Sequence, residues 1–295
     1  MELRSNVSDV ALIFEGGGMR GAYSAGVMAA LLGEGIFFDY VCGISAGSSN
    51  TVSYIARSPE RARAAFVDFA DDPRFGSWWT WIQGKGLFNA KYIYEETYLP
   101  DGPLPFDFES FSANPAQFRI GAFDAAAAQT IYWSRQDIKC TADLMRKVRA
   151  SSSIPLVMPT VDIDGRLYVD GALGVGGGLA LSVAQRDGYT KFFVVRTRER
   201  TYVKPPYRLS SVLKILYHRY PAIAEGIAVR HTQYNATHEE LLELERQGQA
   251  YIVFPKQMTL TNQTRDVVTL QAGYEAGLAQ GHSEAPAWKD FLNLN

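Results

Sequence analysis

A serine between two glycines is the most direct chemical signal in this sequence. The pentapeptide GISAG fits the pattern G-x-S-x-G, with Ser45 at its centre and Gly43 and Gly47 at its ends. It follows an apolar run at 37–42 and precedes a helix expected at 48–56. A strand–turn–helix corner of this kind exposes the serine Oγ as a nucleophile for acyl transfer. The same pattern also occurs in plain structural turns, but its place between strand and helix favours a nucleophile elbow.

An earlier turn with the sequence EGGGMRG follows the apolar run 10–14 and precedes a small-residue helix at 22–32. Successive glycines let neighbouring N–H groups converge on one negative oxygen beside a helix N-terminus, so we expect an oxyanion hole here. Its residues are Gly16, Gly17, Gly18, Met19, Arg20 and Gly21. Two roles stay open for Arg20: a structural or exposed arginine, and a group that attracts an anionic head group.

The same turn satisfies G-x-G-x-x-G, the fingerprint of dinucleotide-binding folds. That fingerprint requires an acidic residue at the end of the second strand, where it binds the ribose. The nearest candidate, Asp39, sits inside the second apolar run rather than at its end. A phosphate-loop NTPase would need a Lys-Ser/Thr pair after the glycines, and none follows. A non-catalytic dinucleotide-binding protein is therefore kept only as an alternative.

The serine needs a base, and the sequence offers an aspartate and four histidines. Asp170 closes a short strand and precedes Gly171, which lets chain and substrate approach. The commoner role of an aspartate before glycine is that of a turn residue. The histidines, all in the C-terminal part and none in a short loop just after a strand, are His218, His231, His238 and His282. A Ser-His-Asp esterase is the near alternative to a Ser-Asp pair.

Three motifs in this order, EGGGMRG, GISAG and the DGA that begins at Asp170, together resemble the patatin-like phospholipase family. The resemblance covers about residues 10–198 and includes the segment ASSSIP. It implies a Ser-Asp dyad, in which Ser45 is the nucleophile and Asp170 activates it and later a water molecule. It also implies hydrolysis of lipid acyl esters through an acyl-serine, without metal or cofactor. Family members often continue the aspartate motif with a polar residue and proline, whereas this chain continues with LGVGGG.

Two strand–turn–helix units in succession predict a three-layer α/β/α fold, with a mainly parallel central sheet and the site at the strand ends. Further strands are expected at 117–124, 130–134, 160–169, 191–197 and 250–254. Further helices are expected after Thr141, near 179–186, at 209–247 with a break at Pro221, and at 267–280. We expect one domain over 1–295. Its motif-bearing core covers about 10–198, and a helical C-terminal part, about 205–295, packs on that core.

The composition narrows the class of protein. The formal net charge is −2, from 29 Lys and Arg against 31 Asp and Glu, so no global basic field indicates nucleic acid as a partner. Two cysteines, Cys42 and Cys140, are too few for a disulfide framework and are expected to be reduced thiols. No apolar run has the length of a transmembrane span. We therefore expect a soluble, cytoplasmic protein with no metal or cofactor, and the oligomeric state stays open.

The expected substrate is a lipid or another acyl ester. Residues 71–115 form the least regular region, and we expect them to supply a lid or wall for an acyl chain. Their Trp78, Trp79 and Trp81 suit a lipid interface, but burial is the commoner fate of such rings and is our expectation. We interpret Lys204, Arg208, Lys214 and Arg219 as a solvated helix face rather than a contact with anionic lipid. Peripheral membrane contact stays open, as does a lipid-binding protein without turnover.

Overall fold

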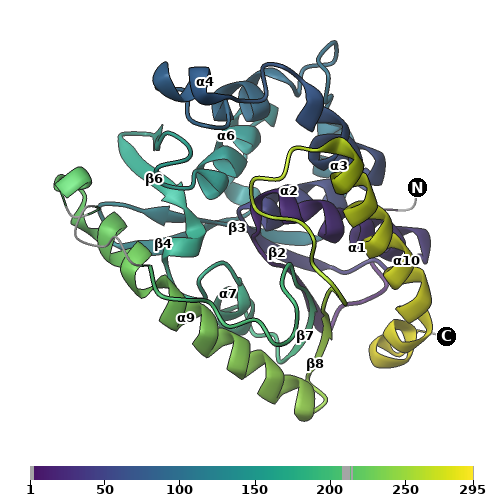
Figure 1. Ribbon diagram of the computed structural model, residues 1–295. Helices are drawn as coiled ribbons and strands as arrows, with labels where there is room; N and C mark the ends of the chain where they lie inside the picture. The colour runs from purple at the N-terminus through teal and green to yellow at the C-terminus, as the bar shows by residue number, and fades with distance from the viewer. Residues whose placement is uncertain (1–2, 208–212, 214, 295) are drawn as a thin grey trace.

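The computed structural model describes residues 3–207, 213 and 215–294 (Figure 1). The strands are β1 (Val10–Phe14), β2 (Tyr40–Ile44), β3 (Gln117–Asp124), β4 (Gln129–Trp133), β5 (Val161–Ile163), β6 (Arg166–Asp170), β7 (Lys191–Val195) and β8 (Ala250–Val253). The α-helices are α1 (Gly21–Gly33), α2 (Ala46–Ile55), α3 (Pro59–Phe66), α4 (Trp78–Ile82), α5 (Phe108–Ala113), α6 (Thr141–Ser152), α7 (Leu181–Arg186), α9 (Pro221–Arg246) and α10 (Val267–Leu292). Short 3₁₀ or π segments are η1 (Gly18–Arg20), η2 (Asp68–Asp71), η3 (Tyr92–Glu96), η4 (Arg135–Asp137) and η5 (Gly171–Leu173).

The described strands form one mixed sheet in the order β5-β6-β3-β2-β1-β7-β8, with β4 also paired to β3. The five strands β3, β2, β1, β7 and β8 run parallel, and β4, β5 and β6 are antiparallel additions at one end. Both β2 and β6 lie along the same edge of β3, because β4 occupies its other edge over the shared residues. On that edge Ile44 pairs with Gly121 and Asp170 pairs with the next residue, Ala122.

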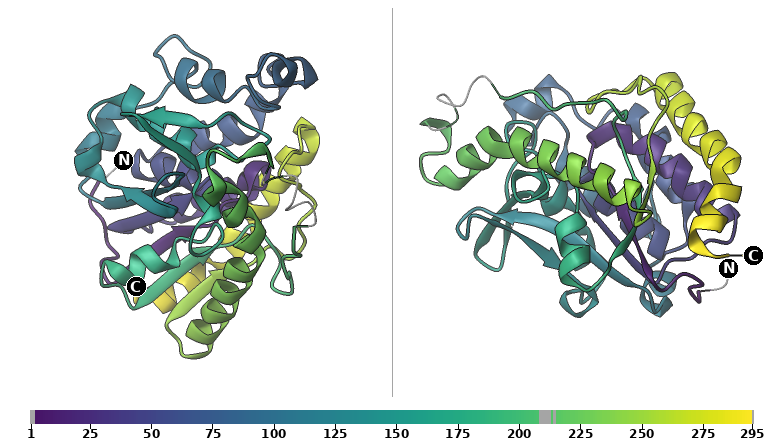
Figure 2. Two further views of the ribbon diagram at one scale, coloured as in Figure 1. Left: turned by 90° about the vertical axis from the view of Figure 1, so that its left-hand side faces the viewer. Right: turned by 90° about the horizontal axis from the view of Figure 1, so that it is seen from below.

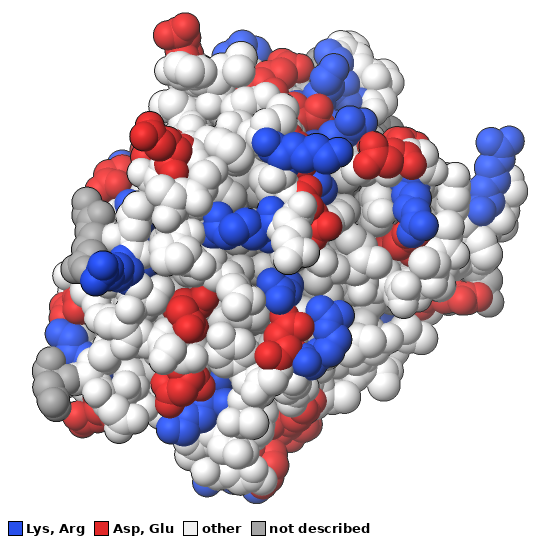
Figure 3. Space-filling view, turned by 180° about the vertical axis from the view of Figure 1, so that it is seen from behind, with Lys and Arg blue, Asp and Glu red and all other residues white. Residues whose placement is uncertain are grey.

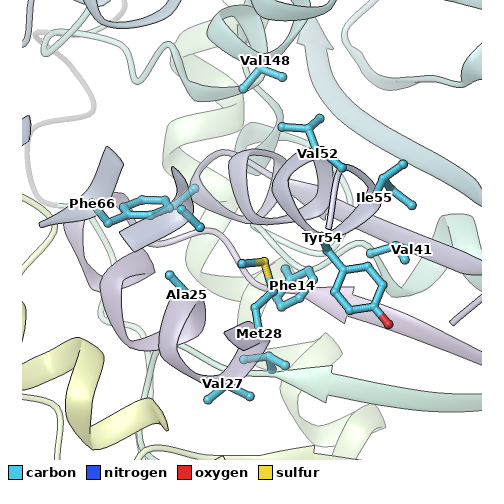
Figure 4. Close-up of a cluster of buried hydrophobic side chains, with 14 of the residues drawn as sticks. Phe14, Ala25, Val27, Met28, Val41, Val52, Tyr54, Ile55, Phe66 and Val148 are labelled. Atoms are coloured by element: carbon cyan, nitrogen blue, oxygen red, sulfur yellow. The ribbon is translucent and has the colours of Figure 1, made fainter. Parts of the chain in front are cut away.

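Helices cover both faces of the sheet, as the α/β/α prediction requires. The side chains of β1 alternate between two cores: Leu12 and Phe14 lie in one, Ala11 and Ile13 in the other. Helices α1, α2, α3 and α10 lie on the first face, and α7 and α9 on the second (Figures 1 and 2). A strand that is buried on both faces reads as a continuous apolar run, which is why VALIF shows no alternation. In Figure 4, Phe14, Met28 and Val52 lie together between β1, α1 and α2.

The C-terminal part joins this architecture at two places. Strand β8 extends the sheet beside β7, and α10 packs along α1. The two helices approach closely at glycines on both sides: a Cβ on Gly26 would lie 2.0 Å from the Tyr274 carbonyl oxygen, and one on Gly277 would lie 2.1 Å from that of Tyr23. Any larger residue at either position would push the helices apart. The single-domain interpretation of 1–295 stays a prediction.

Several local expectations need correction. The second strand is β2 (Tyr40–Ile44) rather than 37–42, because Phe38 makes only an isolated bridge before the regular pairing begins. Helix α9 (Pro221–Arg246) begins at the proline where the helical region 209–247 was expected to break, and residues 209–212 and 214 lie outside the described part.

The expected burial of the tryptophans is wrong for Trp79 and Trp81, whose side chains are 72% and 49% exposed. Helix α4 projects from the layers and is anchored by its flanks, where the Phe75 and Phe88 rings meet edge to face at 5.4 Å. Both cysteines are free, as expected.

The surface agrees with the near-neutral composition. Acidic and basic side chains are interspersed over the back face of the molecule, with no extended field of one sign (Figure 3). Within the described residues, none of the helices combines the length and apolar character that crossing a bilayer demands.

Candidate active site

Ser45 sits at the corner between β2 and α2. Its backbone has φ 60° and ψ −128°, a positive-φ conformation that residues with a Cβ rarely adopt. The corner can close because Gly47 lets α2 approach β1: a Cβ there would lie 2.1 Å from the Phe14 carbonyl oxygen. The strain that is typical of a nucleophile elbow is therefore present at the serine itself. The side chain is 4% exposed.

The sheet register brings Asp170 to this serine. Because β2 ends and β6 ends at neighbouring positions on one edge of β3, the residue after Ile44 and the last residue of β6 lie side by side. The Ser45 side chain lies close enough to the Asp170 carboxylate to influence its pKa, and the Asp170 Oδ1 accepts the Ala172 N–H at 2.9 Å. Burial raises the pKa of Asp170 above its ordinary value, while the Arg230 charge, the Ala172 N–H and the Ser45 side chain oppose the shift. A buried carboxylate with a raised pKa is a stronger base than an exposed one.

The glycine turn lies directly against the serine. A Cβ on Gly16 would lie 2.8 Å from the Ile44 carbonyl oxygen and 3.1 Å from the Ser45 Cβ, so only a residue without a side chain fits here. Gly18 adopts a left-handed conformation, with φ 58°, and lines the cavity beside Ser45. The loop that was expected to form an oxyanion hole therefore faces the nucleophile.

Not every N–H group of the turn is available for this role. The Gly16 N–H donates to the Gly178 carbonyl at 3.0 Å, and the Met19 N–H donates to the Asn262 carbonyl at 3.2 Å. The expectation that the amides of Gly16 to Gly18 together hold an oxyanion is thus corrected for Gly16. Gly17 and Gly18 remain as the candidate donors.

An apolar cavity of about 80 Å³ opens beside Ser45. Its walls come from α2, α3 and α6 and from the irregular region 71–115, as expected for that region. Apolar lining residues include Val52, Ala65, Phe66, Phe75, Phe88, Leu104, Met145 and Val148.

Residues 12–176 match the family described as patatin-like phospholipase. This chain belongs to that family. Residues 220–293 match a second family, described as a domain of unknown function (DUF6363). The uncharacterized protein YjjU of Escherichia coli (strain K12) is 27% identical over 190 residues, which is 64% of this chain and 52% of that protein. The chain therefore spans about half the length of this curated relative. A similar solved structure is VipD from Legionella pneumophila, at 12% identity and a TM-score of 0.49, covering 97% of this chain and 67% of that one.

The candidate site is supported by a buried ion pair that sequence reasoning missed. Glu15 precedes the glycine turn at the end of β1, and Arg196 follows the end of β7. The Arg196 Nε donates to Glu15 Oε2 at 2.9 Å, and Tyr234 Oη donates to Glu15 Oε1 at 2.7 Å. The Thr197 N–H also donates to Glu15, and the Thr197 hydroxyl donates to the Gly16 carbonyl at 3.0 Å. Despite desolvation, the Arg196 charge and these hydrogen bonds lower the pKa of Glu15. The sequence did contain a signal for this pair, because the acidic Glu15 and the basic Arg196 each stand at the carboxyl end of an expected strand.

The four histidines have other partners. His238 contacts Arg196 at 3.0 Å and the Arg200 carbonyl at 3.0 Å. His218 and His231 each bond a carbonyl three residues earlier, and His282 contacts Glu34. Among the residues that the structure describes, no histidine is hydrogen-bonded to Ser45 or Asp170.

The ribose-binding role considered for Asp39 also lacks geometric support. Asp39 directly precedes β2, so it lies at the amino end of a parallel strand, whereas the glycine turn follows the carboxyl end of β1. Asp39 and the glycine turn therefore lie at opposite ends of these two parallel strands. Its carboxylate accepts a hydrogen bond from Tyr189 at 3.3 Å.

Proposed function

We propose that this protein is a serine acyl hydrolase that cleaves lipid acyl esters through a Ser45–Asp170 dyad. The observation that carries the proposal is a strained serine that lines an apolar cavity and lies beside a buried carboxylate. Membership of the patatin-like phospholipase family supports the class of reaction.

The proposed reaction has two halves. The Ser45 Oγ attacks the ester carbonyl as its proton passes to the Asp170 carboxylate, and the N–H groups of Gly17 and Gly18 stabilise the resulting oxyanion. When the tetrahedral intermediate collapses, Asp170 returns the proton to the leaving alkoxide, and an acyl-serine remains. A water molecule then attacks the acyl carbonyl and gives a proton to Asp170. The fatty acid leaves as Ser45 recovers that proton.

The test is covalent labelling by a fluorophosphonate probe, with turnover of p-nitrophenyl esters and phospholipids measured in parallel. We expect Ser45→Ala to abolish labelling and Asp170→Asn to lower turnover by about 10⁴-fold. The matched control is Ser283→Ala, a change at an exposed serine on α10, which should keep both the labelling and the turnover of the wild type. Labelling that survives Ser45→Ala would place the nucleophile elsewhere.

The alternatives give different results in the same assays. If a histidine is the base, replacing one of the four singly will cut turnover by orders of magnitude, whereas a Ser-Asp dyad tolerates each of these replacements. A dinucleotide-binding protein would show a thermal shift with NAD or NADP and no labelling. A lipid-binding protein without turnover would bind lipid and release no fatty acid.

We also propose that the protein meets lipid at a membrane surface through α4, acting in the cytoplasm as a peripheral protein. The exposed apolar side chains there include Trp79, Trp81 and Ile82, the last 65% exposed. The segments on either side of α4 contribute Phe75 and Phe88 to the cavity wall. Lipid that contacts α4 would therefore be next to the cavity that receives its acyl chain.

A further inference from the structure

Cationic side chains gather on the side of the glycine turn that faces α9. Two come from the segment after β7: the Arg198 guanidinium lies 4.2 Å from the centre of the Tyr202 ring, and the Lys204 Nζ lies 4.5 Å from that of Tyr234. The two rings meet edge to face at 6.0 Å, so they hold both cations in one place. Lys204 is also fixed through its backbone, which exchanges two hydrogen bonds with the Asn235 side chain.

Two further cations complete the group. Arg230 extends from α9, and its Nε donates to the Gly177 carbonyl at 3.1 Å, which brings its charge close enough to act on Asp170. Arg20 lies in the glycine turn itself and is 8% exposed, and its buried Nε has no hydrogen-bond partner among the described residues. Its charge is coupled to that of Arg198. We name Arg20, Arg198, Lys204 and Arg230 the basic cluster.

Among the described residues, no carboxylate is paired with the basic cluster. The adjacent carboxylate, Glu15, is already engaged by Arg196, Thr197 and Tyr234. Within the described part of the chain, no member of the cluster forms a salt bridge. Four like charges held partly out of water and without anions destabilise the folded protein. Such an arrangement is typical of a binding site whose anion is supplied from outside.

We propose that the basic cluster is a subsite for a phosphate-type oxyanion, placed beside the Ser45–Asp170 pair on the side opposite the acyl cavity. Guanidinium and ammonium groups are the usual ligands of phosphate. If the proposed function holds, on which this step rests, the oxyanion is the phosphate of the substrate's head group. One member of the basic cluster, Arg230 of α9, lies within the segment 220–293 that matches the domain of unknown function.

The state of Lys204 fits this role. Burial and the charges of Arg230, Arg20 and Arg198 lower the pKa of Lys204 to about 7, against the opposing attraction of Glu15. The expectation that Lys204 lies on a solvated helix face is therefore wrong, because Lys204 is a half-buried residue in a loop. Arg208 and Lys214 of that expected face lie outside the described residues. A bound oxyanion would restore the proton on Lys204.

The first experiment measures binding without turnover. Sulfate carries a fixed double charge across neutral pH, so it is the probe, and the thermal shift is compared with sodium chloride at equal ionic strength. We expect sulfate to raise the melting temperature of the wild type, less as pH rises through about 7. Lys204→Gln should weaken sulfate binding about tenfold, whereas Lys204→Arg should keep binding and remove the pH dependence. Arg246→Gln, an exposed change on the same helix as Arg230, is the control.

The second experiment compares a lysophosphatidic acid with the monoacylglycerol that has the same acyl chain. The ratio of kcat/KM for the anionic over the neutral substrate should fall about tenfold in Lys204→Gln and in Arg230→Gln, and stay unchanged in Arg246→Gln. A sulfate response without a change in this ratio would support the subsite but refute the head-group assignment. Absence of any specific sulfate response, or only an adventitious ion effect equal in all variants, would overturn the subsite. If no ester is hydrolysed, the proposed function fails, and the sulfate result still decides the subsite.

Discussion

Replacing Ser45 by glycine and by alanine should separate the strain at the elbow from the chemistry of the hydroxyl. Both variants lose the Oγ that lies beside Asp170, so both are expected to be inactive. They differ in the Cβ, which alanine keeps and glycine lacks. At φ 60° and ψ −128°, glycine is free of the clash that a Cβ creates. The stability difference between the two variants therefore reports the backbone strain.

The expected magnitude follows from three opposing contributions. A non-glycine residue in a sparsely populated φ/ψ region lowers the stability of the folded state by about 1–3 kcal/mol. The upper part of that range applies here, because the ψ of Ser45 lies far from that of the left-handed helical well. Glycine loses more backbone entropy on folding, about 0.5–1 kcal/mol. Loss of the buried Cβ removes about 0.8 kcal/mol of burial. The glycine variant should thus be more stable than the alanine variant by about 1 kcal/mol, whereas at an unstrained buried position it would be less stable by about 1.5 kcal/mol.

The assay is equilibrium unfolding in urea with far-UV circular dichroism, supported by melting curves. About 1 kcal/mol corresponds to roughly 2 °C in melting temperature for a chain of this size. The same pair of substitutions at Ser53, buried within helix α2, is the control, where glycine should be the less stable variant. If Ser45→Gly is less stable than Ser45→Ala, as at Ser53, the serine is not strained and the elbow interpretation is refuted.

Two further predictions concern the aspartate and the membrane-facing helix. Because burial raises the folded-state pKa of Asp170 above its unfolded value, its contribution to stability is fully present below the unfolded pKa and is lost as pH rises through the folded pKa. Asp170→Asn should therefore have a larger free energy of unfolding than the wild type at pH 8, and this difference should shrink toward about pH 4 in urea titrations. The wild-type kcat/KM should fall as pH is lowered through the raised pKa of Asp170. A stability difference that grows in acid would contradict this reasoning. The double variant Trp79→Ala, Ile82→Ser should co-sediment with phospholipid vesicles several-fold less than the control variant Lys139→Gln, which changes an exposed residue elsewhere. The reason is that the double variant removes apolar area that would insert into the membrane interface. Equal sedimentation of both variants would exclude α4 as the contact.

Local sequence determined the parts of this site that depend on backbone conformation. A turn that tolerates a sharp reversal requires glycine, and an interior parallel strand must be apolar on both faces. The motifs around Ser45 and Gly17 could therefore be placed at the ends of strands from residue type and spacing alone. The family resemblance rested on these same residues, and the match over residues 12–176 confirms it.

Only the tertiary structure decided which distant groups meet. The side-by-side position of Ser45 and Asp170 comes from two strands that share one edge of β3, a register that no local pattern encodes. The competition for amide donors is likewise long-range, since the Gly178 carbonyl occupies the Gly16 N–H. The basic cluster draws on the glycine turn, the segment after β7 and helix α9. Charges far apart in sequence interact only where folding removes the water between them, and that arrangement is a property of the packed chain.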